Sequence, residues 1–136
     1  LFQHIFALAE YHSCQFVIHH PKALVFRELL DLESSFTAFR GLPISRERRY
    51  FVRDGIVECN HPYWPEESIR QPSRPNWKEL LADLNTIQGE DILSIYASMV
   101  SAVLPGFWSV DFAKSKDGKW YLLDMAPGEL SWHPEH

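Results

Sequence analysis

The sequence has few cysteines, no long apolar run and no excess of positive charge, and each shortage argues against a class of protein. Cys14 and Cys59 are the only cysteines, too few for a disulfide framework and without the spacing of zinc ligands. No run of about 18 apolar residues exists, so no membrane-spanning helix is expected. The formal net charge of -5 at pH 7 argues against broad nucleic-acid binding, which needs a positive surface.

The chain of 136 residues, 46% of them hydrophobic, is large enough to bury a core. It has no internal repeat and no linker, so we expect a single domain over residues 1–136. Its first residues lack the basic flank and cleavage pattern of a signal peptide, which favours a cytoplasmic location. Because the chain begins with Leu1, we also expect an amino-terminal portion upstream of it.

Hydrophobic periodicity and turn residues predict an α+β fold, in which an antiparallel sheet carries helices on one face. In the first third of the chain we expect a short helix over residues 2–12 and strands over 15–18 and 23–30. Residues 31–45 lose this periodicity and contain Gly41-Leu42-Pro43, which favours a loop or a lid over a site.

Asp54-Gly55 separates two strand-like runs, residues 49–53 and 56–60, and predicts a β-hairpin. Four prolines in residues 61–75 predict a loop. The pattern then predicts two helices, from Trp77 to about Asn85 and over residues 90–103. The second helix is expected to bury one stripe of side chains, namely Ile92, Ile95, Tyr96, Met99, Val100 and Val103.

A second Asp-Gly turn, Asp117-Gly118, predicts a closing hairpin of residues 107–113 and 119–125. Asp111 lies six residues before Asp117 and Asp124 six after Gly118, so an unbulged two-residue turn sets the two aspartates opposite each other. Two adjacent carboxylates repel unless a cation lies between them, and hard oxygen ligands favour magnesium or manganese. The alternative is that they pair with Lys114 or Lys119 at the surface.

Three segments occur in one order along the chain: Leu24-Val25-Phe26-Arg27-Glu28-Leu29, then Glu47-Arg48-Arg49-Tyr50-Phe51-Val52-Arg53-Asp54-Gly55, then Ser109-Val110-Asp111-Phe112 with Leu123-Asp124-Met125-Ala126-Pro127-Gly128. Together they resemble the carboxy-terminal half of the ATP-grasp domain: its hinge strand, its arginine strand and its metal-binding hairpin. The arginine-rich version is similar to the clade defined by two arginines and one lysine.

The resemblance implies an ATP-dependent carboxylate-amine ligase with ATP and Mg²⁺ as cofactors, acting through an acylphosphate on a carboxylate substrate and an amine acceptor. It implies that Val25 and Phe26 face adenine and that Glu28 reaches the ribose. Arg49 would face the nucleotide phosphates as a catalytic residue, and Glu47 belongs to the same motif. Asp111 and Asp124 would hold magnesium.

Two further arginines are candidate phosphate contacts. Arg27 would add a second catalytic clamp, or would instead pair across strands with Glu47 or Glu58. Strand alternation returns Arg53 to the side of Arg49, which makes it a reserve contact for the nucleotide. More broadly, the basic cluster from Arg40 to Arg53 either holds phosphates or is a solvated loop.

The sequence also departs from the family pattern. Asp124 stands where a glutamate is usual and Ala126 where a metal-binding asparagine is usual, so Glu129 is a candidate replacement ligand. The family's phosphate-binding lysine and glycine-rich flap are expected in the upstream portion. A catalytically degenerate or truncated ATP-grasp fragment, binding a nucleotide or a protein, is therefore the alternative function. The histidines are expected to be structural or solvated, and Ser131 with His133 is weak evidence for a hydrolase.

Overall fold

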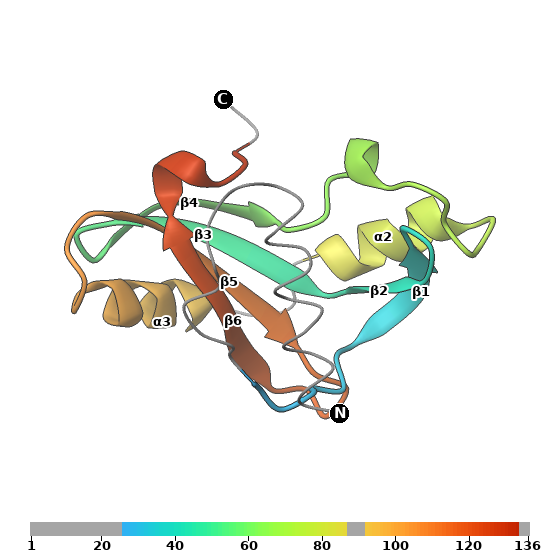
Figure 1. The fold of residues 1–136 in the computed structure, drawn as a ribbon, viewed down its shortest axis with the longest axis horizontal. Coiled ribbons are helices and arrows are strands. Elements are labelled where there is room, and N and C mark those ends of the chain that lie inside the picture. The colour runs from blue at the N-terminus through green and yellow to red at the C-terminus, as the bar shows by residue number, and fades with distance from the viewer. Residues whose placement is uncertain (1–25, 87–91, 134–136) are drawn as a thin grey trace, which may run out of the picture.

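The computed structural model describes residues 26–86 and 92–133, and in them an antiparallel four-stranded sheet forms the centre of the fold (Figure 1). Its strand order is β4-β3-β5-β6. The strands are β3 (Glu47–Arg53), β4 (Ile56–Pro62), β5 (Phe107–Lys114) and β6 (Trp120–Pro127). Two α-helices, α2 (Trp77–Asn85) and α3 (Ile92–Ser101), accompany the sheet, so the predicted α+β fold is confirmed.

The β3–β4 hairpin turns at the predicted Asp54-Gly55 pair. Arg53 lies opposite Ile56, and both turn residues have positive φ, 48° for Asp54 and 82° for Gly55. Two central residues with positive φ form the turn whose twist matches that of the flanking strands, and aspartate and glycine tolerate this conformation best. The Asp54 carboxylate also accepts a hydrogen bond of 2.7 Å from the Gly106 backbone.

The β5–β6 hairpin brings Asp111 and Asp124 opposite each other, as predicted, but by a different route. Near the turn the register is Lys114 to Trp120, which leaves a longer loop than the two residues expected. Gly118, with φ of 86°, occupies the left-handed position of this loop. A β-bulge between Asp111 and Phe112 then shifts the register back by one residue.

The loop or lid expected over residues 31–45 is wrong, because most of it is a second antiparallel hairpin. Its strands are β1 (Ser34–Ala38) and β2 (Leu42–Ser45), joined through the positive φ of Phe39, Arg40 and Gly41. Phe36, Ala38 and Ile44 are buried and supply the core of this hairpin. The alternation is short and partly polar, so it was not recognised in the sequence.

The expected strand over residues 23–30 is wrong for its described part, since residues 26–30 adopt no regular secondary structure. The helix over 2–12, the strand over 15–18, and Val25 lie outside the described residues. The proline-rich stretch after β4 is a loop, as predicted, with one short 3-10 helix at Glu66–Ser68. In the described part of the chain no helix is long and apolar enough to cross a membrane.

Helix α3 packs on one face of the four-stranded sheet, but not through the predicted stripe. Its buried side chains are Leu93, Ala97 and Ser101, whereas Ile95 and Met99 are 58% and 63% exposed. Ile92, Tyr96 and Val103 are also exposed. The helix is apolar on most sides, so periodicity could not choose its buried face. Small residues decide it, because Ala97 and Ser101 let the helix approach the strands closely.

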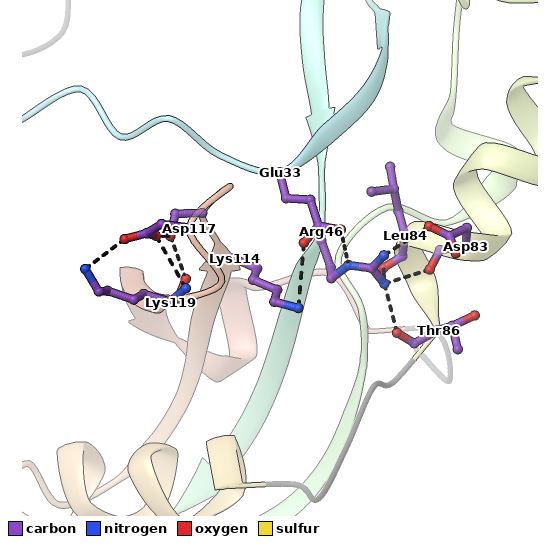
Figure 2. Close-up of polar contacts among 9 residues, drawn as sticks. Glu33, Arg46, Asp83, Leu84, Thr86, Lys114, Asp117 and Lys119 are labelled. Atoms are coloured by element: carbon purple, nitrogen blue, oxygen red, sulfur yellow. Dashed lines mark hydrogen bonds and ion pairs between the residues drawn. The ribbon is translucent and has the colours of Figure 1, made fainter.

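Helix α2 packs against the β1–β2 hairpin through Leu81 and Leu84, which join Phe36 and Ile44 in a second core. Arg46, 2% exposed between β2 and β3, connects this unit to the sheet (Figure 2). Its guanidinium donates to the carbonyl oxygens of Asp83, Leu84 and Thr86 at the end of α2. It also pairs with the carboxylates of Asp83 and Glu33, each at 3.0 Å. Arg46 therefore caps α2 and serves the fold.

Candidate nucleotide and metal site

The four-stranded sheet has two chemically different faces. Tyr50 and Val52 of β3 point to the α3 side, where they join Leu93, Ala97 and Val110 in a core. The register of β3 with β5 is unbroken, so alternation turns the other β3 side chains to the opposite face. We call this the arginine face, and define it by the β3 residues Glu47, Arg49, Phe51 and Arg53.

A row of three charged residues crosses the arginine face. Arg49 lies opposite Asp111 on β5, and Asp111 lies opposite Asp124 on β6. Register partners on neighbouring strands carry their side chains on the same face, about 5 Å apart. The two predicted metal ligands and the predicted phosphate-binding arginine are therefore brought together by the fold.

Arg49 holds Asp111 with a two-pronged hydrogen bond. Nε donates to Oδ1 at 2.8 Å and Nη2 donates to Oδ2 at 2.7 Å. The pKa of Arg49 is raised, chiefly by this bond to Asp111, so the guanidinium stays charged. The guanidinium carbon lies 4.7 Å from the centre of the Tyr63 ring, and Nη1 reaches the carbonyl oxygen of Trp132 at 3.5 Å. Asp124, by contrast, is exposed.

The lysines considered as alternative partners for the aspartates bind elsewhere. Lys114 is paired with Glu33 at 3.8 Å and Lys119 with Asp117 at 2.7 Å (Figure 2). Asp111 forms its ion pair with Arg49 instead. The surface pairing that the sequence left open is thus not the arrangement of this hairpin.

The residues of the row fit magnesium in the way that nucleotide enzymes commonly hold it. Such a site uses one or two carboxylates, and substrate phosphates and water complete the coordination. Asp111 and Asp124 supply two carboxylates on adjacent strands. Within the described residues no cluster of three histidine, cysteine or acidic side chains is arranged for a metal. Glu129, the candidate replacement ligand, is exposed in the short 3-10 helix Gly128–Leu130.

Arg27 lies beside the same row. Its Nη1 donates to the carbonyl oxygen of Leu123, the residue that immediately precedes Asp124 on β6. This bond is neither to Glu47 nor to Glu58, the partners considered from the sequence. Glu28 lines a cavity of about 500 Å³ with Leu29, Leu30 and Tyr121. Phe26 is 62% exposed.

The remaining arginines of the cluster divide between fold and surface. Arg48 is buried and donates to the carbonyl oxygen of Asn85 and the side-chain oxygen of Asn60. Arg53 lies on the arginine face as predicted, where it pairs with Glu58 at 2.7 Å and covers the Phe107 ring at 4.2 Å. Arg40 is exposed in the β1–β2 turn. Neither of the two interpretations of the cluster, a phosphate site or a solvated loop, describes Arg46 and Arg48.

Glu47 is buried on the arginine face, only 8% exposed. Its Oε1 accepts hydrogen bonds from the Ser45 hydroxyl and from the Trp64 indole, the latter at 3.1 Å. Burial raises the pKa of Glu47, and the negative charge of Asp111 adds to the increase, against the opposite effect of the two hydrogen bonds. Glu47 is therefore easier to protonate than an ordinary glutamate.

His61 is a site residue that the sequence analysis missed. It is the register partner of Arg49 on β4, and its Nδ1 lies 2.7 Å from the carbonyl oxygen of Pro62. Its Nε2 is buried, with no hydrogen-bond partner in the described residues. Burial lowers the pKa of His61, so the ring is neutral near pH 7. The register of the Asp54-Gly55 hairpin, counted outward, could have found it.

The segment after β6 returns across β4 beside these groups. The Trp132 ring meets His61 edge-on at 5.2 Å, and Nε2 of His133 lies 3.0 Å from the Cys59 sulfur. The hydroxyl of Ser131 lies 2.6 Å from that of Ser109. These contacts join Ser131 and His133 to different partners, rather than to each other.

The comparisons with known proteins identify the family. A family model, described as an ATP-grasp domain and as family 3 of the clade with two arginines and one lysine, matches residues 5–136. Neither the curated proteins nor the solved structures contain a match to this chain. Family membership implies ATP binding and a function of the ATP-dependent ligase type in general. With nearly its whole length matched, and with its charged row on one sheet face, the chain belongs to family 3 of this clade of ATP-grasp domains.

Proposed function

We propose that this chain provides the magnesium- and phosphate-binding half of an ATP-dependent carboxylate-amine ligase. The observation that carries the proposal is the row of Arg49, Asp111 and Asp124 across three neighbouring strands. A guanidinium binds phosphate oxygens directly, and a pair of carboxylates binds them through a divalent cation. The row thus combines the two kinds of group that phosphoryl transfer needs, and we expect the protein to act in the cytoplasm, where ATP is made available.

The nucleotide is proposed to lie between the hinge segment and β6. The cavity of about 500 Å³ beside Glu28 and Tyr121 is large enough for the adenosine part of ATP. Tyr121 is the register partner of Ala113, which in turn lies opposite Glu47, so it belongs to the same sheet face as Asp124. A nucleotide bound there would extend its phosphates along β6 toward Asp124 and Arg27.

The chemistry proposed is the formation and use of an acylphosphate. A carboxylate oxygen of the substrate attacks the γ-phosphorus, the bond to the β–γ bridging oxygen breaks, and ADP leaves. The amine nitrogen then attacks the acyl carbon, and phosphate leaves with the electrons of the broken carbon–oxygen bond while the amine gives up a proton. Arg49 and Arg27 would donate hydrogen bonds to the oxygens of the transferring phosphoryl group. Magnesium held by Asp111 and Asp124 would neutralise phosphate charge.

Arg49 has two competing tasks in this proposal. It can bind phosphate oxygens only with the donors that it now gives to Asp111. Binding of a magnesium nucleotide would therefore exchange partners, Asp111 turning to the metal and Arg49 to the phosphates. Arg53 is a reserve phosphate contact. The family's phosphate-binding lysine and glycine-rich flap are proposed to come from chain outside residues 1–136, with these residues forming one domain half.

The second candidate function is a catalytically degenerate fragment that binds a nucleotide or a protein without turnover. Ala126 favours it, because an alanine cannot supply the ligand expected at that position. It differs from the leading proposal in one respect that can be measured, namely whether an acylphosphate is formed.

A hydroxylamine trap separates the two functions. The full-length protein is incubated with Mg²⁺-ATP, a pool of carboxylic acids and hydroxylamine, which converts any acylphosphate to a hydroxamate. The ligase proposal expects hydroxamate with an equal amount of ADP, and expects both to disappear in Asp124→Asn. Asp117→Asn, an exposed aspartate in the neighbouring turn, is the control that should retain both. ATP binding without hydroxamate for any acid of the pool would support the degenerate fragment instead.

A further inference from the structure

A second cavity, distinct from the one beside Glu28 and Tyr121, opens on the other side of the same segment. Its volume is about 630 Å³, within the range of sites that hold small organic molecules. Its apolar walls include Leu29, Leu30, Leu42, Pro43 and Trp64. Ser45 and Glu47 also line it, at the end of the arginine face.

Glu47 is the chemically unusual group of this cavity. It is more than nine-tenths buried, although the surrounding walls are largely apolar. The hydroxyl of Ser45 and the indole of Trp64 both donate to Oε1 rather than to Oε2. The neighbouring guanidinium of Arg49 gives two hydrogen bonds to Asp111 rather than to Glu47. Within the described part of the chain, this buried carboxylate therefore has hydrogen-bond donors that are neutral, and a bound cation would stabilise its charge.

The charge of the cavity restricts what it can bind. A second carboxylate near Glu47 would meet repulsion from it and from Asp111, whose charge already acts on Glu47 and raises its pKa. At the rim, Lys116 pairs with Asp31 at 2.7 Å, so that lysine is already matched by an acid. The Trp64 ring offers a face that attracts cations. An apolar body with one ammonium group complements all of these features.

We infer that the cavity binds an apolar primary amine, with its ammonium group on Glu47 and its hydrocarbon part against Leu30, Leu42 and Trp64. The inference rests on the proposed ligase function, for which it names the class of the acceptor. Glu47 and Arg49 are two residues apart on one strand face, which separates their backbones by about 7 Å. An amine on Glu47 would thus lie beside the phosphates, while the nucleotide occupies the opposite side of residues 29–31.

The test uses three six-carbon probes that differ only in their end group: hexylammonium, 1-hexanol and hexanoate, each titrated into the full-length protein by calorimetry. Hexylammonium is expected to bind more tightly than the other two. In Glu47→Gln, which keeps the shape and removes the charge, its affinity should fall by about tenfold or more while that of 1-hexanol is unchanged. Thermal unfolding of the variant establishes that it is folded.

A second variant separates this inference from the ligase proposal. Leu42→Gln changes the apolar wall, so it should weaken hexylammonium and leave the thermal shift caused by Mg²⁺-ATP as in the wild type. Equal binding of hexylammonium and 1-hexanol, or binding of hexylammonium that ignores Glu47→Gln, overturns the inference even where Mg²⁺-ATP binds. Binding of hexylammonium that depends on Glu47, in a protein that Mg²⁺-ATP does not stabilise, would retain the amine site and refute the ligase proposal.

Discussion

Arg49 on β3 and Asp111 on β5 face each other across two strands and are joined by two hydrogen bonds, of 2.8 and 2.7 Å. Their side chains are 13% and 7% exposed, so the pair is largely removed from water. A buried ion pair of this kind is costly to break, because the remaining partner is left charged in an apolar environment. The same two residues are the proposed phosphate and metal contacts, which couples stability to function.

Replacing Asp111 by alanine should therefore lower the free energy of unfolding by about 3 kcal/mol. Urea unfolding followed by circular dichroism measures this change. The matched control is Glu58→Ala, which removes the partner of Arg53 in a pair whose side chains are about half exposed and should cost less than about 1 kcal/mol. Equal, small losses in the two variants would show that the buried pair contributes little.

Arg46 gives a prediction about the fold alone. Arg46→Met removes the donors that satisfy three carbonyl oxygens at the end of α2 and the partner of Glu33 and Asp83. We expect the free energy of unfolding to fall by about 3 kcal/mol, because these buried acceptors are left unsatisfied. Arg74→Gln, at an exposed position, should change it by no more than about 0.5 kcal/mol. A stable Arg46→Met protein would contradict the structural role.

Glu47 makes stability depend on pH in a defined direction. Burial raises the pKa of Glu47 in the folded state above its ordinary value of 4.5. Its stabilising contribution is then complete below pH 4.5 and is lost as the pH rises through the folded-state pKa. Glu47→Gln stays neutral, so its stability relative to the wild type should increase between about pH 4 and pH 7.

Urea unfolding of both proteins across this pH range measures the difference. Glu58→Gln, an exposed glutamate on β4, is the control and should show no comparable trend. A stability difference between Glu47→Gln and the wild type that is flat across the range, or that shrinks toward neutral pH, would be inconsistent with the buried carboxyl described here.

The orientation of α3 can be tested with two substitutions on opposite sides of the helix. Ala97 is fully buried against the sheet, so Ala97→Leu should overpack this contact and lower the free energy of unfolding by about 1–3 kcal/mol. Ile95 is 58% exposed, so Ile95→Gln should change it by no more than about 0.5 kcal/mol. Thermal or urea unfolding distinguishes the two. The opposite ranking would restore the stripe expected from periodicity.

The sequence predicted the features that depend on turns and alternation. Asp54-Gly55 marked one hairpin, and strand alternation placed Arg49 and Arg53 on one face. The facing of Asp111 and Asp124 was correct although the turn is longer than assumed, because the bulge beside Asp111 restores the register. Two local deviations cancelled, which a count along the sequence could not reveal.

The features that failed depend on which surfaces meet in three dimensions. Nothing local distinguishes Ala97 from Met99 as the buried side of an apolar helix, since the choice is made by how closely α3 can approach β3 and β4. Arg46 and Arg49 are alike in sequence, yet one caps α2 and the other faces Asp111. His61 joins the site only because of its register with Arg49.

The most direct test of the central claim is the thermal shift of the full-length protein with ATP in the presence and absence of Mg²⁺. The account predicts that ATP raises the unfolding temperature only when Mg²⁺ is present, and that Asp124→Asn abolishes the rise while Asp117→Asn retains it. Asp124 is exposed, so its replacement should leave the unliganded protein as stable as before. A rise that is unchanged in Asp124→Asn, or no rise in the wild type, would contradict the proposed site.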